Sequence, residues 1–175
     1  MDKEFESQLS VSLDDYIKMI DLKTGYLIGL AAELGAVSTG MDSEICEKVR
    51  DYGRLIGRAF QIQDDYLEIF SNSLNMGKSL ESDIVLGKKT FLMIPALEKD
   101  SDIINSALEL ARNDFEKGIG NIRLYLENEG IKEKTQLEID RILKLADNKL
   151  NDLPINKEKL FYFKFLLNRI IINTN

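Results

Sequence analysis

Apolar residues recur every three or four positions along almost the whole chain, and no segment alternates with a period of two. This pattern predicts helices over residues 12–35, 42–70, 90–98, 101–117, 119–128, 133–152 and 157–172. Residues 71–89 are rich in Ser, Asn, Gly and Lys, which indicates a long loop or a broken helix. We therefore expect a single all-α domain over residues 1–175, built as a helical bundle of six or seven helices.

The first predicted helix begins with a capping box, because Ser12 is followed three residues later by Asp15. Its apolar stripe, read at 100° per residue, contains Tyr16, Ile20, Leu27, Leu30 and Leu34. Lys23 falls at the centre of this stripe, where a cation costs several kcal/mol unless an anion or water meets it. Lys23 therefore either extends to solvent or pairs with an acid, or it faces the same cavity as the carboxylates of the next predicted helix. In that cavity it would contact a diphosphate, with Thr24 beside it as a hydroxyl donor.

Small residues form a second edge of this helix, at Gly25, Gly29 and Ala32. Such an edge would allow a neighbouring helix to approach closely, which is a packing feature and not a chemical one.

The stretch "AFQIQDDYLEIF", residues 59–70, concentrates carboxylates on one sector of the next predicted helix. Gln61, Asp64, Asp65 and Glu68 share that sector, Gly57 lies one turn earlier, and no lysine is among them. The sector is either a solvated face or the wall of a cavity. Clustered oxygen ligands without nitrogen or sulfur favour Mg²⁺, which proteins commonly share with a phosphate group.

Lysines follow glycines in the predicted loop, with Lys78 after Gly77 and with Lys88 and Lys89 after Gly87. A lysine-bearing loop is usually only a solvated loop. Here it follows the carboxylate sector directly, so it is also a candidate lid over a phosphate ligand.

Composition narrows the function classes. Lys and Arg number 23 against 30 Asp and Glu, a net charge of −7, so we expect no nucleic acid partner. The chain has no histidine, which excludes imidazole metal sites and His-based catalytic triads, and Cys46 is its only cysteine. The N-terminus is too polar for a signal peptide, and no apolar run reaches the roughly 18 residues of a membrane span. We expect a cytoplasmic protein that does not span a membrane.

Three segments in order resemble the trans-prenyltransferase, or polyprenyl synthetase, family of isoprenoid diphosphate synthases. They are "LKTGYLIGLAAELGA", "GRAFQIQDDYLEIF" and "MGKSLESDIVLGKKTFLMIPALE", with a weaker likeness continuing to the C-terminus. The resemblance implies the C-terminal portion of the isoprenoid synthase fold. It also implies a prenyltransferase that condenses an allylic diphosphate with isopentenyl diphosphate, with Mg²⁺ assisting ionisation.

The resemblance also assigns residues. Asp64, Asp65 and Glu68 correspond to the metal ligands of the second aspartate-rich motif. Lys23, Lys78 and Lys88 correspond to diphosphate contacts, and Lys23, Thr24 and Gln61 to catalytic groups near the reacting carbon. Glu68 departs from the family pattern, which has an aspartate there, and Ser82 stands before Asp83 where the family has a glycine.

The first aspartate-rich motif of the family has no counterpart in this sequence. Asp14 and Asp15 are better explained by the dipole at the start of a capped helix. We therefore expect the chain alone to be incomplete, and to act as a homodimer or with a partner chain that supplies the missing half. The alternatives are a non-catalytic or regulatory subunit of a complete synthase, and a helical interaction domain without a ligand. Product length and allylic primer stay open.

Overall fold

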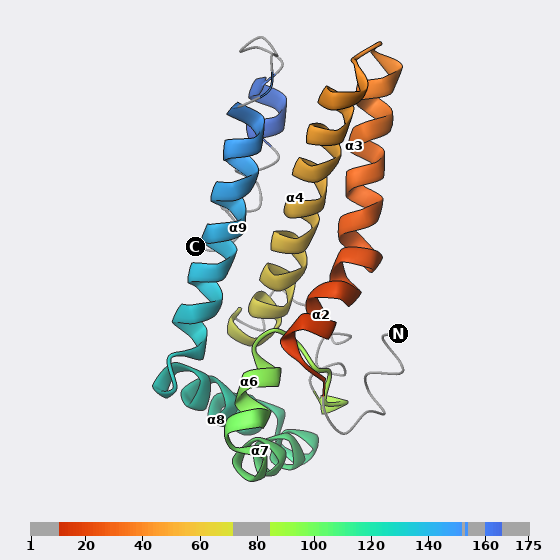
Figure 1. Cartoon of the computed structure of the whole chain (residues 1–175). Helices are drawn as coiled ribbons and strands as arrows, with labels where there is room; N and C mark the ends of the chain where they lie inside the picture. The colour runs from red at the N-terminus through yellow and green to blue at the C-terminus, as the bar shows by residue number, and fades with distance from the viewer. Residues whose placement is uncertain (1–10, 72–84, 152, 154–159, 166–175) are drawn as a thin grey trace. The chain divides into compact units, whose positions relative to one another are not determined.

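The computed structural model describes residues 11–71, 85–151, 153 and 160–165, and these residues contain helices and no strand. The helices are α2 (Leu13–Ile20), the π-helical turn η1 (Asp21–Gly25), α3 (Tyr26–Ser38), α4 (Ser43–Phe70), α6 (Met93–Lys99), α7 (Ser101–Asn113), α8 (Phe115–Asn128) and α9 (Ile131–Asn151) (Figure 1). The all-α prediction is confirmed. Of the last predicted helix, only residues 160–165 are described, and they are helical.

The chain divides into two compact units. Unit 1 contains residues 1–16 and 64–137, and unit 2 contains residues 17–63 and 138–175. The division falls within α2, α4 and α9. The expectation of one domain over the whole chain stays a prediction.

Unit 1 has a continuous apolar core contributed by the end of α4 and by α6, α7 and α8. Its buried members are Ile69, Leu92, Met93, Ala96, Ile104, Ala107, Leu108, Ile119, Ile122, Leu126 and Ile131. Burying a side chain of this size stabilises a fold by roughly 1.5–3 kcal/mol. This shared core therefore holds α6, α7 and α8 together.

The break between α7 and α8 falls at Asp114, and the prediction that one helix runs over residues 101–117 is wrong. The Asp114 carboxylate accepts a hydrogen bond from the Lys117 amide at 3.2 Å and so caps the start of α8. Gly118, which we expected to separate the helices, lies inside α8. A Cβ on Gly118 would lie 2.3 Å from the Ala111 nitrogen, so this glycine permits the close crossing of α7 and α8.

Unit 2 is built from α3, most of α4 and the larger part of α9. The buried positions of α4 and α9 recur at helical spacing, at Val49, Tyr52, Ile56 and Ala59 and at Ile139, Ile142, Ala146 and Leu150. The Lys149 ammonium lies 3.2 Å from the Asp51 carboxylate. The Tyr52 hydroxyl donates to the Phe163 carbonyl at 2.7 Å, which ties residues 160–165 to α4.

Candidate functional site

The π-helical turn η1 carries Lys23 and Thr24, and it changes the face of the helix on which later side chains lie. An i→i+5 turn holds one residue more than an α-helical turn, which shifts the phase of the side chains by about 100°. Tyr16 and Ile20, before the turn, are buried, whereas Leu27 and Leu34, after it, are 66% and 58% exposed. The single buried stripe expected from the sequence is therefore wrong beyond residue 20. Lys23 itself is exposed.

The face of α3 that packs is the small-residue edge, as predicted, and its neighbour is α4. A Cβ on Gly57 would lie 2.7 Å from the Gly25 Cα, and a Cβ on Gly53 would lie 2.9 Å from the Gly29 Cα. The two backbones are thus close enough that only glycine fits at these contacts. The order of the contacts, 25 with 57 and 29 with 53, makes the two helices antiparallel.

This close approach brings two of the predicted catalytic residues together. The Thr24 hydroxyl donates a hydrogen bond to the Gln61 Oε1 at 3.0 Å, and both residues are half-buried. We call Lys23, Thr24 and Gln61 the lysine–threonine group. Thr24 and Gln61, which are 37 positions apart in sequence, are therefore in direct contact within unit 2.

An ion pair beside this group was not predicted from the sequence. The Arg58 guanidinium donates from Nε to the Asp21 Oδ1 at 2.8 Å and from Nη2 to the Asp21 Oδ2 at 2.5 Å. The spacing in the sequence does not indicate this pair, because one turn back from Thr24 and one turn back from Gln61 lead in opposite directions along antiparallel helices.

The predicted metal ligands lie in unit 1, at the end of α4. The Asp65 side chain is 1% exposed and the Glu68 side chain 4% exposed. The Lys88 ammonium lies 3.5 Å from the Asp65 Oδ1 and 3.7 Å from the Glu68 Oε2. The Tyr16 hydroxyl donates a short hydrogen bond to the Asp65 Oδ2. We call Asp65, Glu68 and Lys88 the carboxylate group.

Burial is the main electrostatic influence on Asp65. It raises the pKa of the Asp65 carboxyl, while the Lys88 ammonium and the Tyr16 hydroxyl oppose this rise. The Asp65 Oδ1 is buried and accepts no hydrogen bond from any residue that the structure describes. Asp65 and Glu68 are therefore two buried acids that share the Lys88 ammonium.

Two further residues were predicted to take part in this site. Asp64 is exposed, and Lys78 lies outside the described residues. Asp15 is accounted for by the helix start, as expected, because the Ser12 hydroxyl accepts a hydrogen bond from the Asp15 amide at 3.1 Å and donates to its carboxylate at 2.7 Å.

The carboxylate group fits a hard cation in its donor chemistry. Asp65 and Glu68 offer oxygen atoms alone, one helical turn apart, and Asp65 has a buried oxygen available to a ligand. No three His, Cys, Asp or Glu side chains in the described ranges converge into a metal site of their own. Mg²⁺ is commonly bound through one or two carboxylates together with water and substrate phosphate, so two carboxylates suit it.

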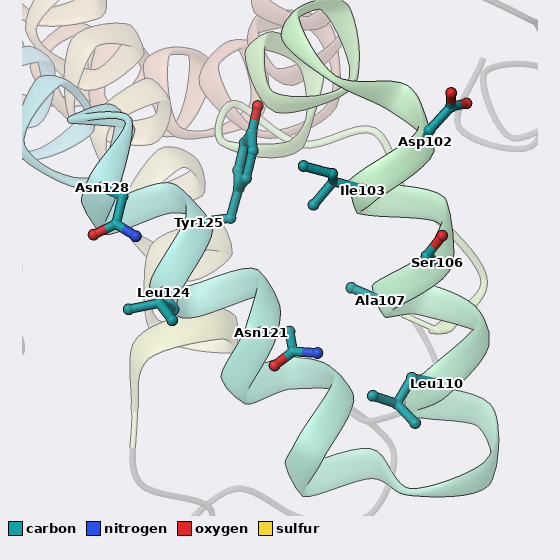
Figure 2. A pocket seen from close by; sticks show the side chains of 9 residues that line it. All are labelled: Asp102, Ile103, Ser106, Ala107, Leu110, Asn121, Leu124, Tyr125 and Asn128. Carbon is teal, nitrogen blue, oxygen red and sulfur yellow. The ribbon is translucent and has the colours of Figure 1, made fainter.

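A pocket lies elsewhere in unit 1, in the α7–α8 hairpin. Its volume is about 610 Å³. Figure 2 shows its lining side chains, which come from α7 and α8: Asp102, Ile103, Ser106, Ala107, Leu110, Asn121, Leu124, Tyr125 and Asn128. None of these residues was predicted to take part in the chemistry. None of the described helices is both long and apolar enough to cross a bilayer.

Comparison with known proteins identifies the family of this chain. The profile described as polyprenyl synthetase matches residues 1–122. The geranylgeranyl diphosphate synthase of Saccharolobus solfataricus is 33% identical over 168 residues, covering 90% of this chain and 48% of the relative. The short chain isoprenyl diphosphate synthase of Methanothermobacter thermautotrophicus is 42% identical over 102 residues, covering 58% of this chain and 31% of the relative.

Solved structures give the same result for the fold. A geranylgeranyl pyrophosphate synthase superposes with a TM-score of 0.84 at 29% identity, covering 97% of this chain and 54% of the other. The geranylgeranyl pyrophosphate synthetase of Pyrococcus horikoshii has a TM-score of 0.78 at 29% identity, covering 95% and 52%. The chain thus spans about half the length of the relatives it matches most fully. With its profile match, its paired motifs and its helical fold, this chain belongs to the polyprenyl synthetase family.

Proposed function

We propose that this chain contributes one half of the active site of an isoprenoid diphosphate synthase. The reaction joins an allylic diphosphate to isopentenyl diphosphate. The carbon–oxygen bond of the allylic substrate breaks and pyrophosphate leaves, the alkene of isopentenyl diphosphate attacks the allylic carbon, and a proton is then lost. The product is a longer trans-polyprenyl diphosphate.

The acids of the carboxylate group, together with Asp64, take the cation-binding role in this proposal. Asp64, Asp65 and Glu68 would hold Mg²⁺. When bound, Mg²⁺ supplies positive charge that stabilises the leaving diphosphate. Lys88, which lies beside Asp65 and Glu68, is close enough to these acids to contact a diphosphate that binds there, and Lys78 is assigned the same role by resemblance alone.

The lysine–threonine group takes the substrate-orienting role. Lys23 is an exposed ammonium that can bind diphosphate oxygens as a point charge. The Thr24 hydroxyl donates to the Gln61 Oε1, which fixes the orientation of both side chains. Fixed dipoles near the reacting carbon stabilise developing charge better than mobile ones.

One observation supports the proposal most directly: the carboxylates of Asp65 and Glu68 are buried one helical turn apart, with side chains 1% and 4% exposed. Burying negative charge costs several kcal/mol unless cations compensate it. The burial of both acids therefore favours a cation-binding site over a solvated helix face.

A second helical half is part of the same proposal. Beyond the π turn, α3 carries Leu27, Leu30, Leu34 and Val37 on one face, at 66%, 36%, 58% and 56% exposure. The matched relatives are about twice as long as this chain. We propose that the remaining helices of the synthase fold cover this face, in the same polypeptide or in a partner chain. Homodimerisation remains a prediction from the resemblance, and a cytoplasmic location remains a prediction from the polar N-terminus and the lack of a long apolar run.

A non-catalytic or regulatory subunit is the second candidate, and the same exposed apolar face favours it, because such a subunit also needs a surface for its partner. The two candidates differ in ligand binding. The catalytic half binds an allylic diphosphate with Mg²⁺, whereas a purely regulatory subunit does not.

Isothermal titration calorimetry with geranyl diphosphate tests the proposal. We expect binding in Mg²⁺, loss of binding in EDTA, and loss of binding in the Asp64→Asn/Asp65→Asn variant. Addition of a chain containing the other half of a synthase should then give product from isopentenyl diphosphate. A folded chain that binds no diphosphate in Mg²⁺ would contradict the catalytic candidate and leave the regulatory one.

A further inference from the structure

The π-helical turn η1 needs support from the rest of unit 2. A π turn is rare and less favourable than the α-helical turn that could replace it, and it persists where surrounding contacts fix it. Here the turn presents Lys23 and Thr24, two residues of the proposed site. The contacts that fix this turn therefore also fix the positions of those two residues.

Three contacts join the turn to one short stretch of α4. The first residue of the turn, Asp21, pairs with Arg58, and the fourth, Thr24, bonds to Gln61. The fifth, Gly25, lies against Gly57 at backbone contact distance. Of these three contacts, the Asp21–Arg58 pair is the one between charged groups.

The geometry of the ion pair suits a positioning role. Both oxygens of Asp21 accept hydrogen bonds from separate nitrogens of Arg58, so the carboxylate is fixed in direction as well as in distance. The Asp21 side chain is 29% exposed and the Arg58 side chain 28% exposed, which limits screening by solvent. A fixed Asp21 in turn holds the start of the π turn against α4.

We infer that Asp21 and Arg58 are positioning residues that hold η1 in its π-helical form and so set where Lys23 and Thr24 stand beside Gln61. The part that concerns diphosphate rests on the proposed function. The part that concerns the form of the turn does not, and it can be tested without a ligand.

A matched control exists in the same two helices. The Arg50 Nη1 lies 3.1 Å from the Glu33 Oε1, with the Arg50 side chain 34% and the Glu33 side chain 24% exposed. This pair also joins α3 to α4, but it lies well beyond the π turn. Glu33→Gln therefore removes an ion pair of similar burial without touching η1.

Amide hydrogen exchange of the full chain, read by NMR, tests the turn itself. In Asp21→Asn we expect exchange at the amides of residues 24–26 to rise about tenfold, and in Glu33→Gln to change less than about twofold at the same amides. Arg58→Lys keeps the positive charge but cannot donate two parallel hydrogen bonds to Asp21, so its increase in exchange should lie between those of the other two variants. Equal effects of Asp21→Asn and Glu33→Gln, or no effect of either, would overturn the inference.

Calorimetric titration with geranyl diphosphate in Mg²⁺ tests the consequence for the site. We expect Asp21→Asn to raise the Kd about tenfold and Glu33→Gln to leave it within about twofold. The exchanged pair Asp21→Arg/Arg58→Asp should recover most of the lost affinity. Equal losses in Asp21→Asn and Glu33→Gln, or no recovery in the exchanged pair, would overturn the role in binding.

The two failures are distinguishable. If the unmodified chain binds no diphosphate, the proposed function is wrong, and the exchange data still decide whether the pair holds the turn. If exchange at residues 24–26 is indifferent to Asp21→Asn, the inference is wrong even where the chain binds diphosphate.

Discussion

The two groups of predicted site residues are built in opposite ways. The lysine–threonine group in unit 2 is held by a hydrogen bond between neutral side chains and by backbones in contact through glycines. The carboxylate group in unit 1 consists of buried charges, two acids and one ammonium. The first group is fixed by the packing of the polypeptide itself, whereas the second gains from any cation that joins it.

This difference separates two kinds of contribution to a site. Groups fixed by packing can orient a substrate before it binds, because they need no reorganisation. Groups that carry uncompensated charge depend on the ligand for part of their stability, as any ligand-linked equilibrium requires. Substitutions in the two groups should therefore differ in how Mg²⁺ changes their effect.

The largest effect is expected where the backbones touch. Gly57→Ala would add a Cβ 2.7 Å from the Gly25 Cα, so α3 and α4 must separate, at a cost of roughly 3 kcal/mol in the free energy of unfolding. Urea denaturation measures it, and Mg²⁺ should not reduce the loss. Gly35→Ala is the control, since a Cβ there meets nothing within 4 Å and alanine favours a helix by about 0.5–1 kcal/mol. Equal effects at the two glycines would contradict the close packing.

Removal of the ammonium should come next. Lys88→Met removes the ammonium beside the buried Asp65 and Glu68, which should lower the free energy of unfolding by about 2 kcal/mol in EDTA. Added Mg²⁺ should restore part of this loss, unlike that of Gly57→Ala. Lys48→Met, which breaks an exposed pair with Glu44, should cost at most about 0.5 kcal/mol. A loss that Mg²⁺ does not change would contradict a cation site here.

Asp65→Asn should stabilise the chain in EDTA by about 1 kcal/mol at neutral pH, because the amide removes a buried charge. Burial raises the pKa of Asp65 in the folded state above its value in the unfolded chain. The folded state therefore binds the proton more tightly, and stability from this group falls as pH rises from the unfolded towards the folded pKa.

The stability difference between Asp65→Asn and the unmodified chain, measured by urea denaturation at a series of pH values, should grow as pH rises from the unfolded towards the folded pKa of Asp65. It should be smallest at low pH, where Asp65 is protonated in both states. A difference that does not vary with pH, or that grows towards low pH, would contradict the raised pKa.

The smallest effect is expected for Thr24→Val. It removes one half-buried hydrogen bond to Gln61 and should cost about 0.5–1.5 kcal/mol in thermal or urea unfolding. Mg²⁺ should leave this loss unchanged. Thr39→Val, at an exposed position at the end of α3, provides the comparison and should cost less. If Mg²⁺ removed the stability loss of Thr24→Val, Thr24 would respond to the cation as the carboxylate group does, and the proposed difference between the two groups would be contradicted.

The sequence predicted the helices well, since helical spacing and caps are local properties. It failed at Gly118, because a glycine that ends a helix and one that admits a neighbour look alike until the neighbour is known. It failed beyond Ile20 as well, because a π turn changes the phase without leaving a sign in the pattern.

For the site, the residues themselves indicated a carboxylate sector on α4. In the structure Asp65 and Glu68 of this sector have buried side chains, whereas Asp64 is exposed. That Thr24 stands near Gln61 came from resemblance, because no local pattern relates residues 37 positions apart. The Asp21–Arg58 pair could not be predicted, since it depends on how two helices cross.

The π-helical form of η1 makes the face of α3 depend on the hydrogen bonding of one turn. If this turn became α-helical with all its residues kept, α2 and α3 would run on as one regular helix. The large apolar side chains after the turn would then rotate by about 100° towards the face of Tyr16 and Ile20. That helix would be more regularly amphipathic, and Thr24 would move away from its present place beside Gln61. The π turn is therefore a point where regular amphipathic packing of the helix and the arrangement of the proposed site oppose each other.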